Sequence, residues 1–327
     1  MSKPLPYNRQ TALASRIASD NAAHITGKVI LTTGVTLGGL GATFVFEIAK
    51  YNPALLILAG RNASKIQSVI DKLRNSEETI NVQTKALVLD LSSQQNVRNA
   101  AKEVLESSEQ CIDVLVNSAG LMGGPYRKTE EGIELQFGSN YLGHWLFTNL
   151  IMPKLLAAKH PRVVNVSSGG HRYGGIRFED WNFEDGKTYN QWVAYGQSKT
   201  GNVLFSKALA RKLGSRGLQS YSLHPGVNLE TSLSGAVEGG FSKEDIAELE
   251  AMNKKLGWTE DFDMKDLDEC AATHVAAAFD PRLKPYNGAY LEDGNVSDRL
   301  QPTATNPEDI DKLWKLSEKL VGQEFDY

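Results

Sequence analysis

The sequence predicts a doubly wound α/β fold, with one parallel sheet between two layers of helices. Two observations lead to this fold class. Short, continuously apolar strands alternate with helical segments from residue 29 onwards, and this alternation is typical of a parallel sheet covered on both faces. A cluster of glycines separates the first strand from the helix that follows it, and such sheets bind phosphate groups at that place.

The predicted elements follow one another in order along the chain. Strands are predicted for the apolar or β-branched runs at 29–33, 55–59, 86–89, 112–116, 163–166 and 219–223. Helices are predicted between them at 42–50, 66–73, 92–105, 132–158 and 190–213. The second of these has an apolar stripe at i, i+3, i+4 and i+7. Ser92 and Gln95 are spaced as a capping box for the third.

The alternating elements predict a single domain over residues 26–300. An N-terminal extension, 1–25, is polar and Ala-rich and can hold a short helix at 11–23. The acidic, Gly-containing stretch 232–268 lacks a clear period. In an α/β enzyme such an insertion is typical of a lid over the substrate, so we expect a lid there.

The C-terminal segment, 301–327, is predicted to contain a helix. Asn306 suits the cap, Pro307 the first helical position and Gly322 the stop. The residues between them form a mostly apolar stripe of Ile310, Leu313, Trp314, Ser317 and Leu320 or Val321. We expect this helix to dock on the domain, and binding to a partner protein is the alternative.

The composition excludes several classes of function. The 327 residues contain 35 Lys+Arg and 39 Asp+Glu, a formal net charge of −4, so no large positive field attracts nucleic acid or anionic lipid. The two cysteines lie far apart in the sequence and cannot build a disulfide framework or a zinc cluster. No apolar run approaches the roughly 18 residues of a membrane helix. We therefore expect a soluble, cytoplasmic protein without a metal site, which binds neither nucleic acid nor membrane.

The glycine cluster predicts a nucleotide cofactor. Gly34, Gly38, Gly39 and Gly41 lie between the first strand and the next helix. Glycines there allow a tight turn and let the backbone approach a pyrophosphate at the N-terminus of the helix. An ordinary glycine-rich turn is the alternative.

Arg61 predicts which nicotinamide cofactor is bound. An NAD site places Asp or Glu about 20 residues beyond the glycines to bind the ribose 2′-hydroxyl, whereas this chain has Gly60, Arg61 and Asn62 there. A guanidinium pairs with a 2′-phosphate that a carboxylate would repel. The sequence therefore predicts NADP(H), with an exposed surface arginine as the alternative reading. Asp90, which ends the third strand, can accept a hydrogen bond from an adenine amino group or cap the next helix.

Tyr195 and Lys199 are the main candidates for catalysis. They lie four residues apart and so share one face of the predicted helix 190–213. The strand before that helix ends in Ser167 and Ser168, at the sheet edge where α/β folds bind ligands. An ammonium close by favours the phenolate of a tyrosine whose ordinary pKa is about 10, so the pair suits proton transfer. A packing aromatic and a solvated lysine are the alternatives.

Together these features resemble the short-chain dehydrogenase/reductases over roughly residues 26–300. The resemblance is carried in chain order by the glycine loop, Asn117-Ser118-Ala119-Gly120, Ser167-Ser168, Tyr195-x-x-Ser198-Lys199 and His224-Pro225-Gly226. Within the family the chain is most similar to the branch of the retinol dehydrogenases, the WW-domain oxidoreductase and a chloroplast-translocon reductase. That similarity is carried by Ala59-Gly60-Arg61-Asn62 and Asn140-Tyr141-Leu142-Gly143-His144.

The resemblance implies a Rossmann-type sheet in the order 3-2-1-4-5-6-7 and four catalytic residues. Tyr195 would be the general acid/base and Lys199 its activator. Ser168, or Ser167 as the fallback, would orient the carbonyl, and Asn140 would relay protons through water. The implied cofactor contacts are Gly34, Gly38, Gly39, Leu40, Gly41, Arg61, Asp90, Leu91, Asn117, Ala119, Gly120, Tyr195, Lys199, Pro225, Gly226, Val227 and Thr231. The glycine loop has one residue more than the family pattern, so which glycine meets the pyrophosphate stays open.

The expected function is an NADP(H)-dependent interconversion of a ketone or aldehyde and an alcohol. The pocket is expected between 122–126, 171–192 and 232–268, and its aromatic side chains favour an apolar substrate, unless they form a small core of their own. These side chains are Tyr173, Trp181, Phe183, Tyr189 and Trp192. A catalytically quiet NADP-binding scaffold and a non-redox enzyme on the same fold are the alternatives. Family members commonly pair through their two long helices, which allows a homodimer or homotetramer.

Overall fold

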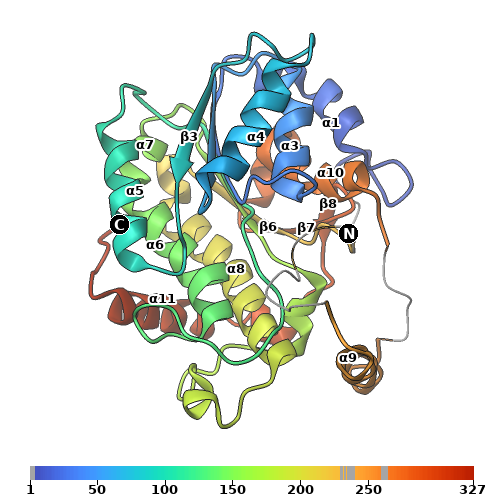
Figure 1. The fold of residues 1–327 in the computed structure, drawn as a ribbon, viewed down its shortest axis with the longest axis vertical. Helices are drawn as coiled ribbons and strands as arrows, with labels where there is room; N and C mark the ends of the chain where they lie inside the picture. The colour runs from blue at the N-terminus through green and yellow to red at the C-terminus, as the bar shows by residue number, and fades with distance from the viewer. Residues whose placement is uncertain (1–3, 229–230, 232, 234–239, 259–263) are drawn as a thin grey trace.

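A sheet with helices on both faces forms the centre of the molecule (Figure 1). The computed structural model describes residues 4–228, 231, 233, 240–258 and 264–327. Within them eight strands pair in the order β3-β2-β1-β4-β5-β6-β7-β8. They are β1 (Val29–Thr33), β2 (Leu55–Gly60), β3 (Thr84–Val88), β4 (Val114–Asn117), β5 (Arg162–Val166), β6 (Gln219–Leu223), β7 (Tyr290–Glu292) and β8 (Asn295–Ser297). The predicted fold class and strand order are confirmed, and β8 is added.

The helices connect the strands and cover the sheet. They are α1 (Ala14–Asp20), α2 (Ala22–Ile25), α3 (Leu40–Ala49), α4 (Ala63–Arg74), α5 (Gln94–Glu106), α6 (Gly143–Leu150), α7 (Met152–Leu156), α8 (Gln191–Leu213), α9 (Lys243–Lys255), α10 (Leu267–Phe279) and α11 (Pro307–Val321). A π-helical turn, η1 (Phe137–Leu142), precedes α6. Short 3₁₀ turns lie at η2 (Gly169–Tyr173), η3 (Phe183–Gly186), η4 (Gly214–Arg216), η6 (Pro281–Tyr286) and η7 (Pro302–Ala304).

Two apolar cores lie on the two faces of the sheet. On one face α3, α4 and α10 pack against the strands, with α1 packed on α3 and α10. On the other face lie α5, α6 and α8, with α11 packed on α8. Every residue of β4 and β5 is buried, as expected for central strands covered on both sides.

The predicted helix 132–158 begins later and is divided. Gly132 has a left-handed φ of +80° and lies in a turn, so regular helix starts only beyond it. The segment then consists of η1, α6 and α7. Pro153 lies in the first turn of α7 because proline has no backbone N–H to donate to a preceding turn.

The predicted capping box at Ser92 is wrong by one residue. The N-cap of α5 is Ser93, whose hydroxyl accepts from the backbone N–H of Asn96 (3.3 Å). Ser92 instead donates its N–H and its hydroxyl to one oxygen of Asp90 (2.9 and 2.7 Å). Asp90 therefore shapes the turn before α5, but the cap itself is Ser93, so the predicted capping role of Asp90 is wrong.

The hairpin of β7 and β8 was not predicted. Asp293 and Gly294 connect the two strands, with φ of 52° and 66°. A two-residue hairpin turn of this type needs positive φ at both positions, and Asp-Gly is one of its commonest sequences. That dipeptide was the available signal in the sequence.

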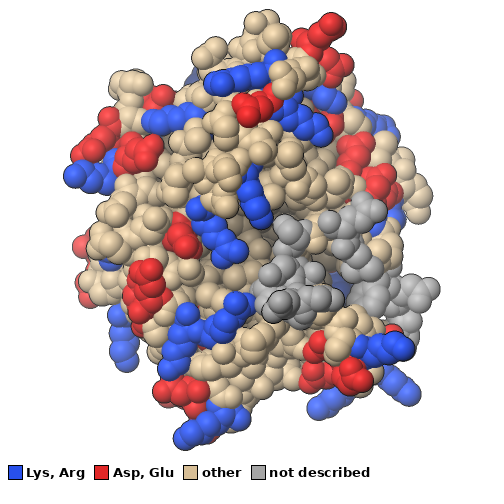
Figure 2. Space-filling model, in the orientation of Figure 1, with Lys and Arg blue, Asp and Glu red and all other residues tan. Residues whose placement is uncertain are grey.

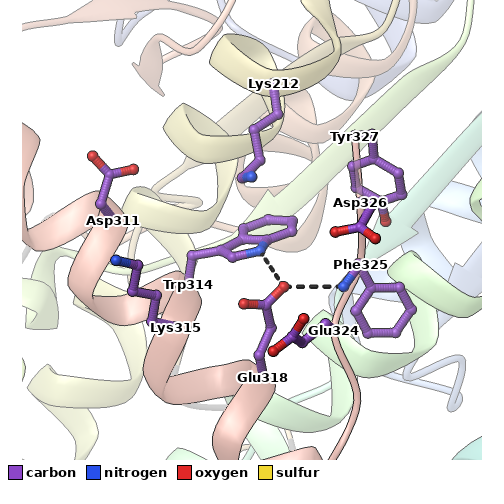
Figure 3. A pocket seen from close by; sticks show the side chains of 9 residues that line it. All are labelled: Lys212, Asp311, Trp314, Lys315, Glu318, Glu324, Phe325, Asp326 and Tyr327. Carbon is purple, nitrogen blue, oxygen red and sulfur yellow. Dashed lines mark hydrogen bonds between the residues drawn. The ribbon is translucent and has the colours of Figure 1, made fainter.

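The C-terminal helix begins and ends as predicted, at Asn306 and at Gly322 with φ 66°. Trp314 packs edge-to-face against Trp145 of α6, with 5.1 Å between ring centroids. Beyond α11 the chain turns back, and one oxygen of Glu318 accepts from the Trp314 indole (2.9 Å) and from the backbone N–H of Phe325 (3.0 Å) (Figure 3). Phe325 also packs on Trp145, at 5.3 Å.

Acidic and basic side chains are interspersed over the face of the molecule shown in Figure 2. Among the described residues, no helix combines the length and the apolar character needed to cross a membrane.

Candidate active site

The predicted site residues gather where β1, β4, β5 and β6 end. These strands are neighbours in the sheet and run in parallel, so their carboxyl ends form one edge. Asn117 ends β4, Ser167 and Ser168 follow β5, and η1 and α8 bring Asn140, Tyr195 and Lys199 to the same edge. We call this region the catalytic edge.

The loop from β1 to α3 needs glycine at two close approaches. A Cβ at Gly34, where φ is +74°, would lie 2.6 Å from the Ala119 Cα. A Cβ at Gly41 would lie 2.8 Å from the Gly34 carbonyl oxygen. Gly38 has φ +76° with open space around it, and no side chain caps the N-terminus of α3 at Gly39. Gly34 and Gly41 therefore pack the loop, and within the described residues no side chain caps the N-terminus of α3, where an anion would bind.

Thr33 and His144 tie three segments of the catalytic edge together. The Thr33 hydroxyl oxygen accepts from the backbone N–H groups of Ser118 and Ala119 (both 3.0 Å) and contacts His144 Nε2 at 2.9 Å. Nδ1 of that ring lies 3.0 Å from the Asn140 carbonyl. Burial lowers the pKa of His144 to about 4, so the ring is neutral. Because a carbonyl only accepts, Nδ1 carries the proton and Nε2 accepts from Thr33.

Tyr195 lies against Ser168 and is only 3% exposed. Burial raises the pKa of Tyr195 to about 12, and hydrogen bonding to the Ser168 side chain opposes that rise. The Ser168 hydroxyl also accepts from the backbone N–H of Gly170 (3.0 Å). A Cβ at Gly170 would lie 2.7 Å from the Tyr195 ring, so this glycine gives the phenol its space. Without a bound ligand the phenol is neutral at pH 7 and holds a proton.

Ser167 faces away from this pair. Its hydroxyl donates to the Lys199 carbonyl (2.7 Å) and is buried. Of the two serines, Ser168 is therefore the one positioned beside Tyr195.

Lys199 is a buried cation one helical turn from Tyr195. Its Nζ donates to the Val166 carbonyl (3.0 Å) and lies 5.6 Å from the centroid of the Tyr195 ring. Burial lowers the pKa of Lys199 to about 8, so the ammonium persists at neutral pH. Its positive charge favours a negative charge on the phenol, in the direction that proton transfer requires.

Asn140 fixes the loop after β4 to α8. Its side-chain oxygen accepts from the Leu121 N–H (2.9 Å), and its amide nitrogen donates to the Leu121 carbonyl (2.8 Å) and to Ser198 Oγ (3.0 Å). Ser198 in turn donates to the Tyr195 carbonyl (2.8 Å). A Cβ at Gly120 would lie 3.4 Å from Lys199 Nζ and 3.5 Å from the Asn140 side-chain oxygen. The four predicted catalytic residues thus belong to one cluster.

Comparison with known proteins identifies the family. The sequence profile described as "short chain dehydrogenase" matches residues 28–181. Human retinol dehydrogenase 13 is 35% identical over 94% of this chain and 88% of its own length. Mouse retinol dehydrogenase 14 is 33% identical over 90% of this chain and 86% of its own length. The chain belongs to the short-chain dehydrogenases.

Solved structures of short-chain dehydrogenases and related folds agree in architecture. An uncharacterized protein from Mycobacterium paratuberculosis has a TM-score of 0.69 and 28% identity, over 94% of this chain and 99% of its own. The NADPH-bound carbonyl reductase from chicken fatty liver has a TM-score of 0.58 and 19% identity, over 83% and 99%. At 19% identity, the similarity to the carbonyl reductase shows only that the two folds are alike.

Of the remaining residues predicted to bind the cofactor, most lie around this edge. Arg61 directly follows β2 and is exposed; within the described part of the chain its guanidinium has no hydrogen bond or ion pair. The Asn117 amide donates to Asn165 and Thr148 (2.8 and 3.0 Å), so it joins β4 to β5 and α6. Leu91 lies on Gly143, where a Cβ would be 2.9 Å from the Leu91 Cβ. Leu40 opens α3.

The loop after β6 borders the same cluster. Pro225, Gly226 and Val227 follow His224, whose Nε2 lies 3.3 Å from the position of a Cβ on Gly169, next to Ser168. Thr231 donates to the Asn228 carbonyl (3.3 Å). Much of the predicted lid, including 234–239 and 259–263, lies outside the described residues.

The described part of the lid region, α9, is fastened over the start of α8. Asn190 donates to Glu248 (2.6 Å), Gln191 to Asp245, and Tyr173 to Asn253 (2.8 Å). Two aromatic residues of the insertion, Phe183 and Tyr189, contact each other with ring centroids 5.6 Å apart. Tyr189 also contacts Tyr126 of the 122–126 loop, at 5.4 Å. Those two contacts fit the small core that was the alternative to a ligand pocket.

Two residues of the site had no predicted role. His144 lies in the Asn140 motif but is polar in an apolar helix, which was the available signal. Glu134 is fully buried and accepts from the backbone N–H groups of Gln136 (2.9 Å) and Phe137 (2.8 Å) at the start of the helix that carries Asn140. Glutamate is not a typical N-cap residue, so nothing in the sequence indicated it.

Proposed function

We propose that this protein is an NADP(H)-dependent oxidoreductase that interconverts a carbonyl and an alcohol on an apolar small molecule, with Tyr195 as general acid/base. The observation that carries the proposal is the cluster of Tyr195, Ser168, Lys199 and Asn140 at the edge where the glycine loop opens. A protein that only binds a nucleotide has no need of a buried phenol paired with a buried ammonium.

The residues divide the work as follows. The neutral Tyr195 phenol gives its proton to the substrate oxygen in reduction and takes it back in oxidation. The Ser168 hydroxyl donates a hydrogen bond to that oxygen as negative charge develops. Lys199 stabilises the phenolate, and Asn140 holds the helix and loop on either side in register. When bound, the nicotinamide supplies or accepts the hydride.

The residues present fit a nicotinamide dinucleotide. The uncapped amides at the start of α3 suit the pyrophosphate, with contacts from Gly34, Gly38, Gly39, Leu40 and Gly41. Asp90, Leu91, Asn117, Ala119 and Gly120 would line the adenosine and ribose side, while Tyr195, Lys199, Pro225, Gly226, Val227 and Thr231 would line the nicotinamide side.

Arg61 supports NADP(H) over NAD(H). It is exposed at the carboxyl end of β2, and no carboxylate replaces it there. We expect Arg61→Asp to weaken NADPH binding about 10- to 100-fold, since one charge-assisted pair is lost and repulsion is added, and to leave NADH binding no weaker. Titration of both cofactors by tryptophan fluorescence measures this. Unchanged NADPH affinity in the variant would contradict the assignment.

An apolar substrate is supported by the side chains near the cluster. The Leu233 side chain lies 3.6 Å from the position of a Cβ on Gly120, and Phe241 packs on Trp192 with ring centroids 5.0 Å apart. The relatives named retinol dehydrogenases are consistent with an alcohol and carbonyl pair. NADPH oxidation followed at 340 nm against a panel of apolar aldehydes and ketones tests the proposal. Cofactor binding without turnover would favour a quiet binding protein, and substrate rearrangement without NADPH oxidation would favour non-redox chemistry.

Pairing of two copies through the helices that carry Asn140 and Tyr195 stays a prediction. The structure adds that α11 packs on this side of the molecule: the hydroxyls of Tyr141 and Ser317 are 2.6 Å apart, and Trp314 lies 6.3 Å from Phe205 of α8. Most of α6 and α8 is already buried within one chain, so a partner copy that approaches this side would meet α11.

A further inference from the structure

The loop after β6 is held from outside by the two residues Met264 and Lys265. The Lys265 N–H donates to the Val227 carbonyl (2.9 Å), and the Asn228 side chain donates to the Lys265 carbonyl (2.9 Å). Met264 pairs with Val227 as in a parallel strand. We call Met264 and Lys265 the clasp. It holds the backbone of Val227 and the side chain of Asn228.

The side chain of Lys265 extends the clasp to the hairpin of β7 and β8. It is 3% exposed, and its ammonium pairs with Asp293 in the hairpin turn at 2.6 Å. Its stem lies against Gly226, which has φ +98° and where any Cβ would collide with the Lys265 Cδ. An ion pair whose ammonium is buried fixes a position more than it adds stability, because burial of the charge costs free energy that the pairing offsets.

The N-terminal extension holds the clasp from the other side. Arg9 donates to the Met264 carbonyl (2.8 Å) and pairs with Glu269 of α10 (2.7 Å). Ser15 of α1 donates its N–H and its hydroxyl to Asp268 (2.8 and 2.7 Å). The clasp is therefore attached to α10, to α1 and to the turn of the hairpin, none of which contains a predicted site residue.

The loop held by the clasp reaches the catalytic edge. His224 lies beside Gly169, one residue from Ser168. Further along the same loop, the Leu233 carbonyl accepts from the Met122 N–H (3.0 Å). A shift of the loop would therefore change the wall of the site.

We propose that Lys265 is a positioning residue that holds Gly226 and Val227 against the nicotinamide half of the cofactor. This rests on the proposed function, since that function places the nicotinamide at this loop. The hairpin turn and the N-terminal extension then contribute to cofactor binding without touching the cofactor.

The test compares the binding of NADPH with that of adenosine 2′,5′-bisphosphate, which contains only the adenosine part of NADPH. NADPH contacts both sides of the site, whereas adenosine 2′,5′-bisphosphate would occupy only the adenosine side. We expect Lys265→Met to weaken NADPH binding about tenfold, because misplacement of a binding loop is costly, and to change binding of the bisphosphate less than twofold. Asp293→Asn, which keeps a residue suited to the left-handed turn, should show the same pattern with a smaller loss.

Lys28→Met is the matched control. Lys28 pairs with Asp113 at 2.8 Å where β1 and β4 begin, at the opposite edge of the sheet, so its loss should leave both affinities unchanged. Equal weakening of both ligands by Lys265→Met, or no weakening of NADPH in either clasp variant, would overturn this inference alone. If the unmodified protein bound neither ligand, the proposed function would fall and the inference with it.

Discussion

The catalytic edge and the C-terminal aromatic cluster both lie largely out of solvent, but the first is built from polar side chains and the second from aromatic rings. The aromatic cluster, which consists of Trp145, Phe205, Trp314, Phe325 and Tyr327, joins rings from α6, α8, α11 and the chain beyond α11. The catalytic edge instead buries a lysine, a histidine and a tyrosine whose pKa values are all shifted by burial.

This difference in composition predicts that the aromatic cluster contributes mainly to stability and the catalytic edge mainly to turnover. Aromatic rings lose few hydrogen bonds when they leave water, and their burial is favourable in proportion to the apolar area removed from solvent. Edge-to-face packing adds a further favourable interaction between the rings. A buried ammonium or imidazole costs free energy unless it is fully hydrogen-bonded. We therefore expect substitutions in the aromatic cluster to change the free energy of unfolding and those at the catalytic edge to change turnover, and each prediction below tests that division.

The largest effect is expected for Tyr195→Phe. The variant removes the proton donor but keeps the ring, so turnover should fall at least about 10³-fold, while NADPH affinity should change less than about twofold. The lost hydrogen bond to Ser168 is worth only about 1 kcal/mol. NADPH oxidation and a thermal melt measure the two quantities. Tyr221→Phe removes a buried hydroxyl of β6 that donates to the Leu283 carbonyl (2.8 Å) and should keep turnover; normal turnover in Tyr195→Phe itself would rule out the proposed acid.

Trp314→Ala should have the opposite signature. Trp314 is 5% exposed and touches Trp145, Phe205 and Tyr327, so its truncation should lower the free energy of unfolding by about 3–5 kcal/mol. Turnover per folded molecule should be unchanged. Chemical denaturation and activity below the transition measure both. Trp314→Phe keeps part of the contact and should lose less; a loss of turnover at full stability would break the division.

The sequence could predict the apolar framework better than the polar site. Continuous apolar strands, the stripe of α4 and the caps of α11 follow from local period and turn chemistry, and all of them are found in the structure. Ser93 and Glu134 make their capping bonds locally, but each is also held by a residue distant in the sequence, which no local pattern reveals. The Ser93 hydroxyl, for example, donates to Glu130 (2.6 Å). Glu134 is fully buried, and its backbone N–H donates to the side chain of Asn182 in the insertion (2.7 Å), 48 residues further along the chain.

A third prediction concerns the pH dependence of stability, through the buried carboxyl group of Glu134. Burial raises the pKa of Glu134 from an ordinary 4.5 to about 7, although two backbone N–H groups oppose the rise. Between about pH 4.5 and 7 the unfolded chain releases a proton that the folded chain keeps. The free energy of unfolding should therefore fall as pH rises across that interval, by up to about 3 kcal/mol from this group.

Glu134→Gln cannot titrate and should lose that slope. The substitution also replaces one carboxylate oxygen, which accepts from a backbone N–H, with an amide NH2 group, which cannot. The variant should therefore have a lower free energy of unfolding than the unmodified protein at pH 5. The difference between the two proteins should shrink toward pH 7. Urea denaturation at pH 5, 6 and 7 measures the gap. Glu103→Gln, on the exposed side of α5, is the control, and a gap that widens with pH would contradict the prediction.

The smallest effect is expected at η3, where the chain itself is strained. Phe183, Glu184 and Asp185 have φ of 59°, 47° and 55°, and Gly186 follows at 97°. Each non-glycine residue in this left-handed region lowers the free energy of unfolding by about 1–2 kcal/mol. Glycine adopts this conformation without that cost. It also gives the unfolded chain more conformational entropy, which offsets part of the gain. Glu184→Gly should therefore raise the free energy of unfolding by up to about 1 kcal/mol. Asp185→Gly should gain less, because it also loses the exposed ion pair with Lys128 (2.8 Å).

The turnover of Glu184→Gly shows whether the strained turn at η3 has a role in catalysis. The turn lies next to Asn182, whose carbonyl accepts from the Tyr126 hydroxyl (3.2 Å), and a Cβ at Gly186 would lie 2.6 Å from the Tyr126 ring. If strain here only closes the insertion, Glu184→Gly should be more stable and fully active, and η3 belongs with the aromatic cluster as a structural element. A more stable variant with lower turnover would mean that the strained turn positions the 122–126 loop beside the substrate, and that the division between stability and chemistry does not hold in the insertion.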